Sequence, residues 1–232
     1  MRIRTVVWFC VMLAFSASAE TEEQGGIVWA YKVCEGGVAI TSGKSLTPAI
    51  PSSTVGKVAV PVQLGGQPVV QIGDYAFYGC AGVTDVVMPN DVREVCDSAF
   101  GSCGNLVSVV LSSNLVTIGP KAFANCKGLT SIILPESVES VGAKAFDGCG
   151  KIVSVTVPAN VVLKDMFPDS YATITSATLL PGATEIAEGV FKGCKKIDSV
   201  KILEGVTSIE REAFSGCSDL KEVVLPGSLL NI

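Results

Sequence analysis

Hydrophobic residues recur along most of this chain in one pattern, L-x-x-I-x-L-P-x-x-V-x-x-I-G-x-x-A-F-x-x-C, which is clearest between Leu129 and Cys149. Successive phenylalanines of this pattern are 23 residues apart, except for one step of 45. They are Phe77, Phe100, Phe123, Phe146, Phe191 and Phe214. A period of about 20 to 29 residues is typical of a solenoid, whose single coil cannot bury its apolar side alone.

Each repeat also contains a strand signal. Ile132 and Leu134 alternate with Ile133 and thus predict a short strand with one buried face and one exposed face. Because the strand recurs once per coil, neighbouring copies should pair in parallel, about 4.8 Å apart, in one curved sheet. The A-F-x-x-C segment is predicted to close each coil as a short helical turn on the opposite side.

The pattern I-P-x-x-V-x-x-I-G-x-x-A-F-x-x-C-x-x-L resembles the BspA-like branch of the leucine-rich repeat proteins, over about residues 58–232. The resemblance implies a leucine-rich repeat solenoid of the α/β class, mostly β. Its right-handed coils of about 23 residues would carry a curved parallel sheet on one face and short helical turns on the other. It also implies a secreted or surface protein whose role is adhesion or other protein binding.

Residues 1–19 have the features of a secretory signal peptide. Arg2 and Arg4 precede an apolar run at 6–15, and Ala17-Ser18-Ala19 provides a small-residue cleavage pattern. The run is about half of the roughly 20 residues that a membrane span needs, although an uncleaved anchor is the alternative. We therefore expect cleavage after Ala19, no membrane insertion of the mature chain, and a secreted or cell-surface location.

The segment 20–57 does not fit the repeat and is predicted to form an N-terminal capping hairpin region. Trp29, Tyr31 and Val33 occupy alternate positions before a Gly-Gly turn, and Val38 and Ile40 resume the alternation after it, as in a β-hairpin. A ligand site around these two rings is the alternative. The insertion LGGQP at 64–68 is expected to loop outwards, as a plain surface loop or as part of a binding face.

One coil of the predicted 58–232 solenoid, at about 158–178, lacks the cassette. We expect Met166, Phe167 and Tyr171 to refill the core there. The alternative is an exposed functional patch formed by Asp165, Asp169 and Tyr171. The sequence stops at Ile232 with no C-terminal cap in view, which predicts either a truncated product or an end that self-associates end to end.

Six of the nine cysteines occupy one column of the repeat. They are Cys80, Cys103, Cys126, Cys149, Cys194 and Cys217. Equivalent positions in adjacent coils lie about 4.8 Å apart, whereas the Cβ atoms of a disulfide lie about 3.5 to 4.5 Å apart. We therefore expect buried thiols in this column, with disulfides as the alternative. Cys34 and Cys96 lie outside the column. A linear ladder without C-x-x-C does not converge on a metal ion, so no metal site is expected.

Composition excludes several classes of function. The chain contains no histidine, no G-x-S-x-G and no glycine-rich phosphate loop, so we expect no enzyme and no cofactor. Without Arg2 and Arg4, 15 basic residues remain against 22 acidic ones, a net charge of −7. With no basic run, nucleic acid is not an expected partner.

The outward strand positions are the candidate binding surface. The central column consists of Val87, Val110, Ile133, Thr156, Thr178, Lys201 and Val224. The flanking column includes Asp85, Ser108, Ser131, Ser154 and Glu222. An exposed apolar stripe from Val87 to Ile133 is typical of an interaction site. The alternative is that β-branched residues simply suit exposed strands.

The sequence therefore predicts a secreted or cell-surface binding module that mediates protein–protein interaction or adhesion through its exposed sheet face. The expected partner is a protein ligand or a host or matrix component. One alternative is a structural repeat segment of a longer surface protein. Another is non-catalytic glycan binding, with stacking surfaces from Trp29, Tyr75, Tyr78 and Tyr171. A carbohydrate-active β-helix enzyme is disfavoured because the outward columns lack facing acids.

Overall fold

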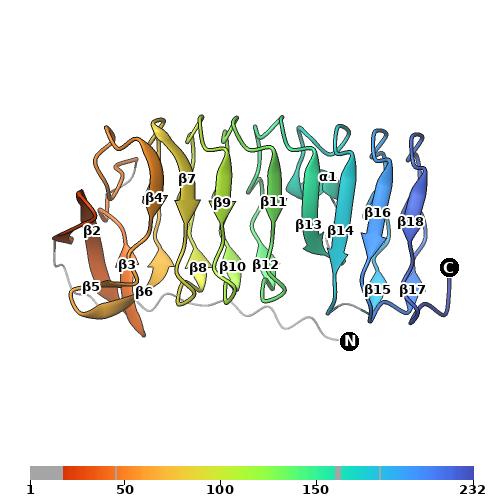
Figure 1. The fold of residues 1–232 in the computed structure, drawn as a ribbon, viewed down its shortest axis with the longest axis horizontal. Coiled ribbons are helices and arrows are strands. Elements are labelled where there is room, and N and C mark those ends of the chain that lie inside the picture. Colours follow the sequence, from red (N-terminus) through yellow and green to blue (C-terminus); the bar gives the residue numbers. More distant parts are fainter. Residues whose placement is uncertain (1–17, 45, 160–162, 183) are drawn as a thin grey trace.

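The chain folds into a single row of stacked coils (Figure 1). The computed structural model describes residues 18–44, 46–159, 163–182 and 184–232, so the predicted signal sequence up to residue 17 lies outside the described residues. Each regular coil contains, in order, a longer strand, a two-residue strand and a turn segment. The predicted leucine-rich repeat solenoid, mostly β, is confirmed.

The longer strands are β4 (Gly56–Ala59), β7 (Val83–Val87), β9 (Ser108–Val110), β11 (Ser131–Ile133), β13 (Ser154–Pro158), β14 (Ser176–Leu180), β16 (Ser199–Ile202) and β18 (Glu222–Val224). The short strands are β8 (Glu94–Val95), β10 (Thr117–Ile118), β12 (Ser140–Val141), β15 (Glu185–Ile186) and β17 (Ser208–Ile209). Most neighbouring strands within each layer pair in parallel, as predicted, but β9 does not pair with β11, and β12 does not pair with β15. Each regular coil has two strands where one was predicted. The additional one is the two-residue strand in the V-x-x-I part of the repeat, which pairs with its copies in adjacent coils.

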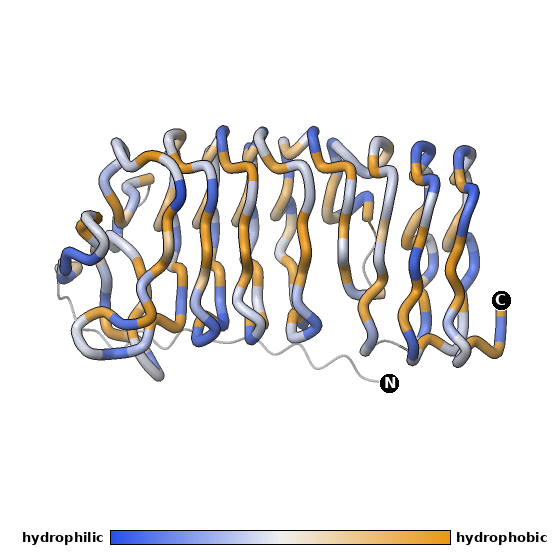
Figure 2. The backbone as a smooth tube through the Cα atoms, in the orientation of Figure 1, coloured by the Kyte–Doolittle hydropathy of each residue, from blue (hydrophilic) through white to orange (hydrophobic). Residues whose placement is uncertain are grey.

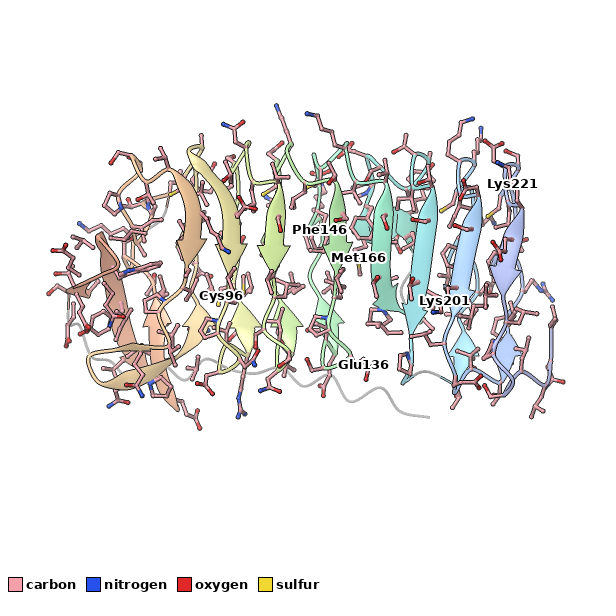
Figure 3. The ribbon with its side chains drawn as sticks, in the orientation of Figure 1. Cys96, Glu136, Phe146, Met166, Lys201 and Lys221 are labelled. Carbon is pink, nitrogen blue, oxygen red and sulfur yellow. The ribbon has the colours of Figure 1, made fainter. Side chains whose placement is uncertain are left out.

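The core runs the length of the stack as repeated columns of apolar side chains. Ile132 and Leu134 are buried, whereas Ile133 is 67% exposed, as the alternation predicts. Phe123 stacks on Phe100 at a centroid distance of 5.1 Å and on Phe146 at 5.3 Å, with the rings almost parallel. Figure 3 shows Phe146 inside the coil, and in Figure 2 hydrophobic residues follow one another along the strands while hydrophilic ones occupy many of the turns.

The A-F-x-x-C segments are consecutive turns, and the expectation of short helical turns is corrected. The residues two before and two after each cassette phenylalanine have positive φ, for example Lys121 at 52° and Asn125 at 60° around Phe123. This left-handed conformation interrupts a helix. It lets alternate N–H groups donate along the stack: Phe123 N–H donates to Ala145 at 2.8 Å and Asn125 N–H to Asp147 at 2.6 Å.

The N-terminal region adds three antiparallel strands to the first coil. They are β1 (Glu20–Gln24), β2 (Ile27–Cys34) and β3 (Gly37–Ile40), and β3 pairs in parallel with β6 (Gln67–Ile72). The Trp29 ring is buried, with its centroid 6.1 Å from that of Phe77 in an edge-on arrangement. Trp29 thus extends the phenylalanine column, which supports the capping role proposed for this region. A ligand site around Trp29 and Tyr31 is wrong, because both side chains are buried.

The LGGQP insertion packs against this N-terminal region. β5 (Gln63–Leu64) turns back on β6 as an antiparallel hairpin, and Leu64 is fully buried. The Gly65 N–H donates to the Glu22 carboxylate at 2.6 Å, and this hydrogen bond lowers the Glu22 pKa. Gln24 Nε2 donates to the Gln63 carbonyl at 2.9 Å. The expectation that the insertion loops outwards is therefore wrong, because Leu64 is buried and the backbone of the insertion is hydrogen-bonded to β1.

The irregular coil fills the core by a different route, as expected. It contains α1 (Leu163–Met166), the only helix in the described part of the chain. Phe167 is fully buried and lies 5.1 Å from Phe146 between ring centroids, tilted by 32°. Met166 is also buried, and Tyr171 packs against the core from a half-buried position. Asp169, placed in the alternative exposed patch, instead accepts a hydrogen bond from the Gly148 N–H and joins the two coils.

Candidate interaction face

Strand register brings the predicted candidate residues into two columns on one sheet face. In the central column, the pairs are Val87 with Val110, Ile133 with Thr156, Thr156 with Thr178, Thr178 with Lys201, and Lys201 with Val224. In the flanking column, Asp85 pairs with Ser108, Ser131 with Ser154, and Ser199 with Glu222. Figure 3 shows Lys201 on this face, on β16.

Side-chain exposure divides the face unevenly. Val110 is 54% exposed and Ile133 67% exposed, but Val87 is half-buried, so the exposed apolar area does not begin at Val87. Val107 and Val153, which sequence reasoning missed, are 49% and 42% exposed. Both occupy the position directly after the first leucine or isoleucine of the repeat, where other coils carry Thr, Asp or Lys. We call the set Val107, Val110, Ile133 and Val153 the apolar patch.

The sheet is interrupted under this patch. β4, β7 and β9 form one three-stranded sheet, while β11, β13, β14, β16 and β18 form a separate five-stranded one. Among the described residues no backbone hydrogen bond joins β9 to β11, although the two strands are neighbours in the stack. Figure 1 shows them further apart than the adjacent pairs. We call this interruption the seam.

Missing hydrogen bonds and partly uncovered core residues both mark the seam. The Leu111 N–H has no acceptor among the described residues, whereas at equivalent positions Met88 donates to Val110 at 3.0 Å and Leu134 to Thr156 at 2.9 Å. Val109 and Leu111 are half-buried, although Val109 aligns with Ile132 and Leu111 with Leu134, which are 2% and 0% exposed.

The same two coils remain joined elsewhere. β10 pairs with β12, and the turn of one coil donates three hydrogen bonds to the turn of the next, from Lys121, Phe123 and Asn125. The seam is thus a wedge that opens on the exposed face only.

A shallow hollow lies beside the seam, near the N-terminal ends of β9 and β11. Its lining includes Asn105, Val107, Gly128, Lys127 and Lys151. Both lysines are exposed, and the ion pairs found in the described residues, Lys192–Glu212 and Lys196–Asp219, involve neither of them. No carboxylate lies on β9, β11 or β13. This end of the seam therefore carries two lysines outside those ion pairs, with the carboxylate of Asp85 on the neighbouring strand β7.

The buried cysteines do not form a chemically active site. All six column cysteines are thiols. The Cys103 thiol donates to the Phe77 carbonyl at 3.0 Å, and Cys126, Cys149 and Cys217 make the equivalent bond one coil back. Burial raises the pKa of Cys103 and of Cys194 to about 12, so both stay protonated at neutral pH. Within the described residues, no cluster of His, Cys, Asp or Glu is suited to a metal ion.

Comparisons with known proteins agree with this architecture. A family model for the BspA type leucine rich repeat region matches residues 65–172 and 162–232, in six copies. The crystal structure of the T. pallidum leucine-rich repeat protein (TpLRR) is 28% identical, with a TM-score of 0.62 over 83% of this chain and 87% of that one. A leucine-rich repeat protein from Bacteroides capillosus is 27% identical, with a TM-score of 0.46 over 58% of this chain and 96% of that one. No protein of curated function matches.

The candidate glycan-stacking rings do not come together. Trp29 is buried, while Tyr75 and Tyr78 form an edge-on pair on the turn segment and Tyr171 lies on the irregular coil. In the part of the chain that the structure describes, no helix is both long and apolar enough to cross a membrane.

Proposed function

Because the chain belongs to the BspA-type leucine-rich repeat family, we propose that it is a secreted or cell-surface module that binds a protein through its exposed sheet face. Leucine-rich repeat proteins generally bind proteins, and the family is typically non-catalytic. The signal-like residues 1–19 support export, with cleavage after Ala19. The proposed partner is a protein ligand or a host or matrix component, and adhesion is the proposed outcome of binding.

The apolar patch is the observation that carries this proposal. Val110 and Ile133 project from adjacent strands into solvent, and Val107 and Val153 are exposed directly before β9 and β13. A cluster of this kind on a solvent-facing sheet is a common mark of a protein-binding surface. Further along the central column the residues change to Thr156, Thr178 and Lys201, which fits an apolar centre with a polar surround.

Binding of the mature chain, residues 20–232, to a panel of immobilised extracellular-matrix proteins tests the proposal by biolayer interferometry. Three proteins are compared: the unmodified chain, the sheet-face variant Val110→Lys and the turn-segment control Lys121→Glu. We expect saturable binding to at least one panel member, weakened at least about tenfold by Val110→Lys and unchanged by Lys121→Glu. Equal binding by all three proteins would exclude the sheet face, and the absence of any binding would count against a matrix partner.

A further inference from the structure

The seam between β9 and β11 presents two features that the paired strands inside the sheet face lack, and that recur at the end strand β18, where Val223 is half-buried and Leu225 is 45% exposed. Unpaired backbone groups line both strand edges, and the half-buried Val109 and Leu111 lie beneath them. Strand edges of this kind are places where another chain can pair or insert, and a partly uncovered core residue gains free energy when a partner covers it. Contact with another protein at the seam would therefore be favourable.

The width of the wedge restricts what can occupy it. Inserting a whole strand would require β9 and β11 to separate to about 9.6 Å, twice the ordinary strand spacing. The pairing of β10 with β12 and the turn hydrogen bonds from Phe123 and Asn125 hold the two coils together on the other sides. A flat apolar side chain, in contrast, would cover the half-buried Val109 and Leu111 without adding a strand. Aromatic side chains are the usual anchors of this type in protein interfaces.

The charges beside the seam indicate which residues of the partner should flank its aromatic anchor. Lys127 and Lys151 are exposed in the hollow beside the seam, without an ion pair among the described residues, and β9, β11 and β13 carry no carboxylate. Carboxylates on a partner would attract both lysines, without repulsion from β9, β11 or β13 themselves.

Resting on the proposed function, we propose that the seam is the anchor site for an acidic segment of a partner protein. In this arrangement an aromatic side chain of the partner enters between Val110 and Ile133, and adjacent carboxylates meet Lys127 and Lys151. The free energy of binding then comes from covering Val109 and Leu111, while the lysines set orientation and association rate.

A designed peptide probes this site directly. The probe is Ac-Ser-Asp-Trp-Asp-Ser-NH2, and the controls replace its Trp by Ala or both Asp residues by Lys. Amide chemical shifts of ¹⁵N-labelled 20–232 are followed during titration. We expect saturable shifts on β9 and β11, with affinity at least about tenfold lower for both control peptides. Absence of saturable binding, or shifts confined to other strands, overturns the proposal.

Two pairs of protein variants separate the seam from the face as a whole. Ile133→Lys alters the seam, while Thr178→Lys makes the same change in the same column where β14 is paired on both sides. Lys127→Glu and the turn-segment variant Lys121→Glu form the charge pair. We expect Ile133→Lys and Lys127→Glu to weaken peptide binding at least about tenfold, and Thr178→Lys and Lys121→Glu to leave it unchanged. Equal losses of peptide affinity from Ile133→Lys and Thr178→Lys would overturn the proposal that the seam is the anchor site, but would leave the proposed function standing. The proposed function fails separately if no protein of the matrix panel binds at the sheet face.

Discussion

Replacing Phe123 by alanine tests the physical basis of the stack. Phe123 is fully buried in a regular coil, between Phe100 and Phe146, whose ring centroids lie 5.1 and 5.3 Å away. Truncating a buried phenylalanine costs about 3 to 5 kcal/mol, from lost transfer free energy and the cavity left behind. Each aromatic pair adds about 0.5 to 1.5 kcal/mol beyond the buried area, so two lost pairs place the expected cost near the upper end of that range.

Phe214 provides the matched control in the same repeat position. It stacks on one ring, that of Phe191 at 5.1 Å, and it is half-buried. Phe214→Ala should therefore cost clearly less than Phe123→Ala, because less apolar area and one fewer ring pair are lost. A domain of ordinary stability has about 5 to 15 kcal/mol in total, so the Phe123 variant should lose a large share of it.

Equilibrium urea unfolding of residues 20–232 measures both costs. Far-UV circular dichroism follows the whole stack, and the fluorescence of Trp29, the only tryptophan after the predicted cleavage site, follows the N-terminal end. We expect the midpoint of Phe123→Ala to fall well below that of Phe214→Ala. A loss of free energy of unfolding below about 1 kcal/mol for Phe123→Ala, or equal losses for both variants, would refute the reasoning about continuous stacking.

Two further predictions concern close approach and thiol ionisation. Gly142→Ala should lower the free energy of unfolding by about 1 to 3 kcal/mol, because the new Cβ would lie 2.4 Å from the Pro120 nitrogen. Gly150→Ala should be almost neutral, because its Cβ would have no atom within 4 Å. Equal urea midpoints for the two variants would contradict this. The pKa values of Cys103 and Cys194 rise from 9.0 to about 12, so unfolded thiols ionise first and stability should fall as pH rises from about 9 towards 12. Urea midpoints of the unmodified chain and of Cys103→Ala, measured across that pH range, check this prediction. The midpoint of the variant should fall less steeply with pH, and identical slopes would argue against a contribution from thiol ionisation.

The sequence was sufficient for the features that depend on side-chain period. Phenylalanine spacing predicted the coils, and the alternation at Ile132 and Ile133 predicted which side chains are buried. The same period predicted that Val110 and Ile133 occupy equivalent outward positions of their strands. These features are predictable because each repeat carries its own copy of the signal and the copies reinforce one another.

Features that depend on a single backbone arrangement were not predictable. Positive φ at Lys121 is not signalled by its residue type, whereas the position two residues after the phenylalanine did carry a signal, because it is glycine in four of the six repeats and Asn125 in another. The burial of Leu64 depends on the contact of Gly65 with Glu22, far away in the sequence. The seam left no signal either, because β9 keeps the same apolar alternation as the paired strands.

Amide hydrogen exchange of residues 20–232 without any partner tests the central claim most directly. The account predicts fast exchange at Leu111, whose N–H has no acceptor among the described residues, and slow exchange at Met88 and Leu134, which donate across paired strands. Equal protection at all three amides, resolved by NMR, would show a continuous sheet between β9 and β11. That result would contradict an open anchor site on the sheet face.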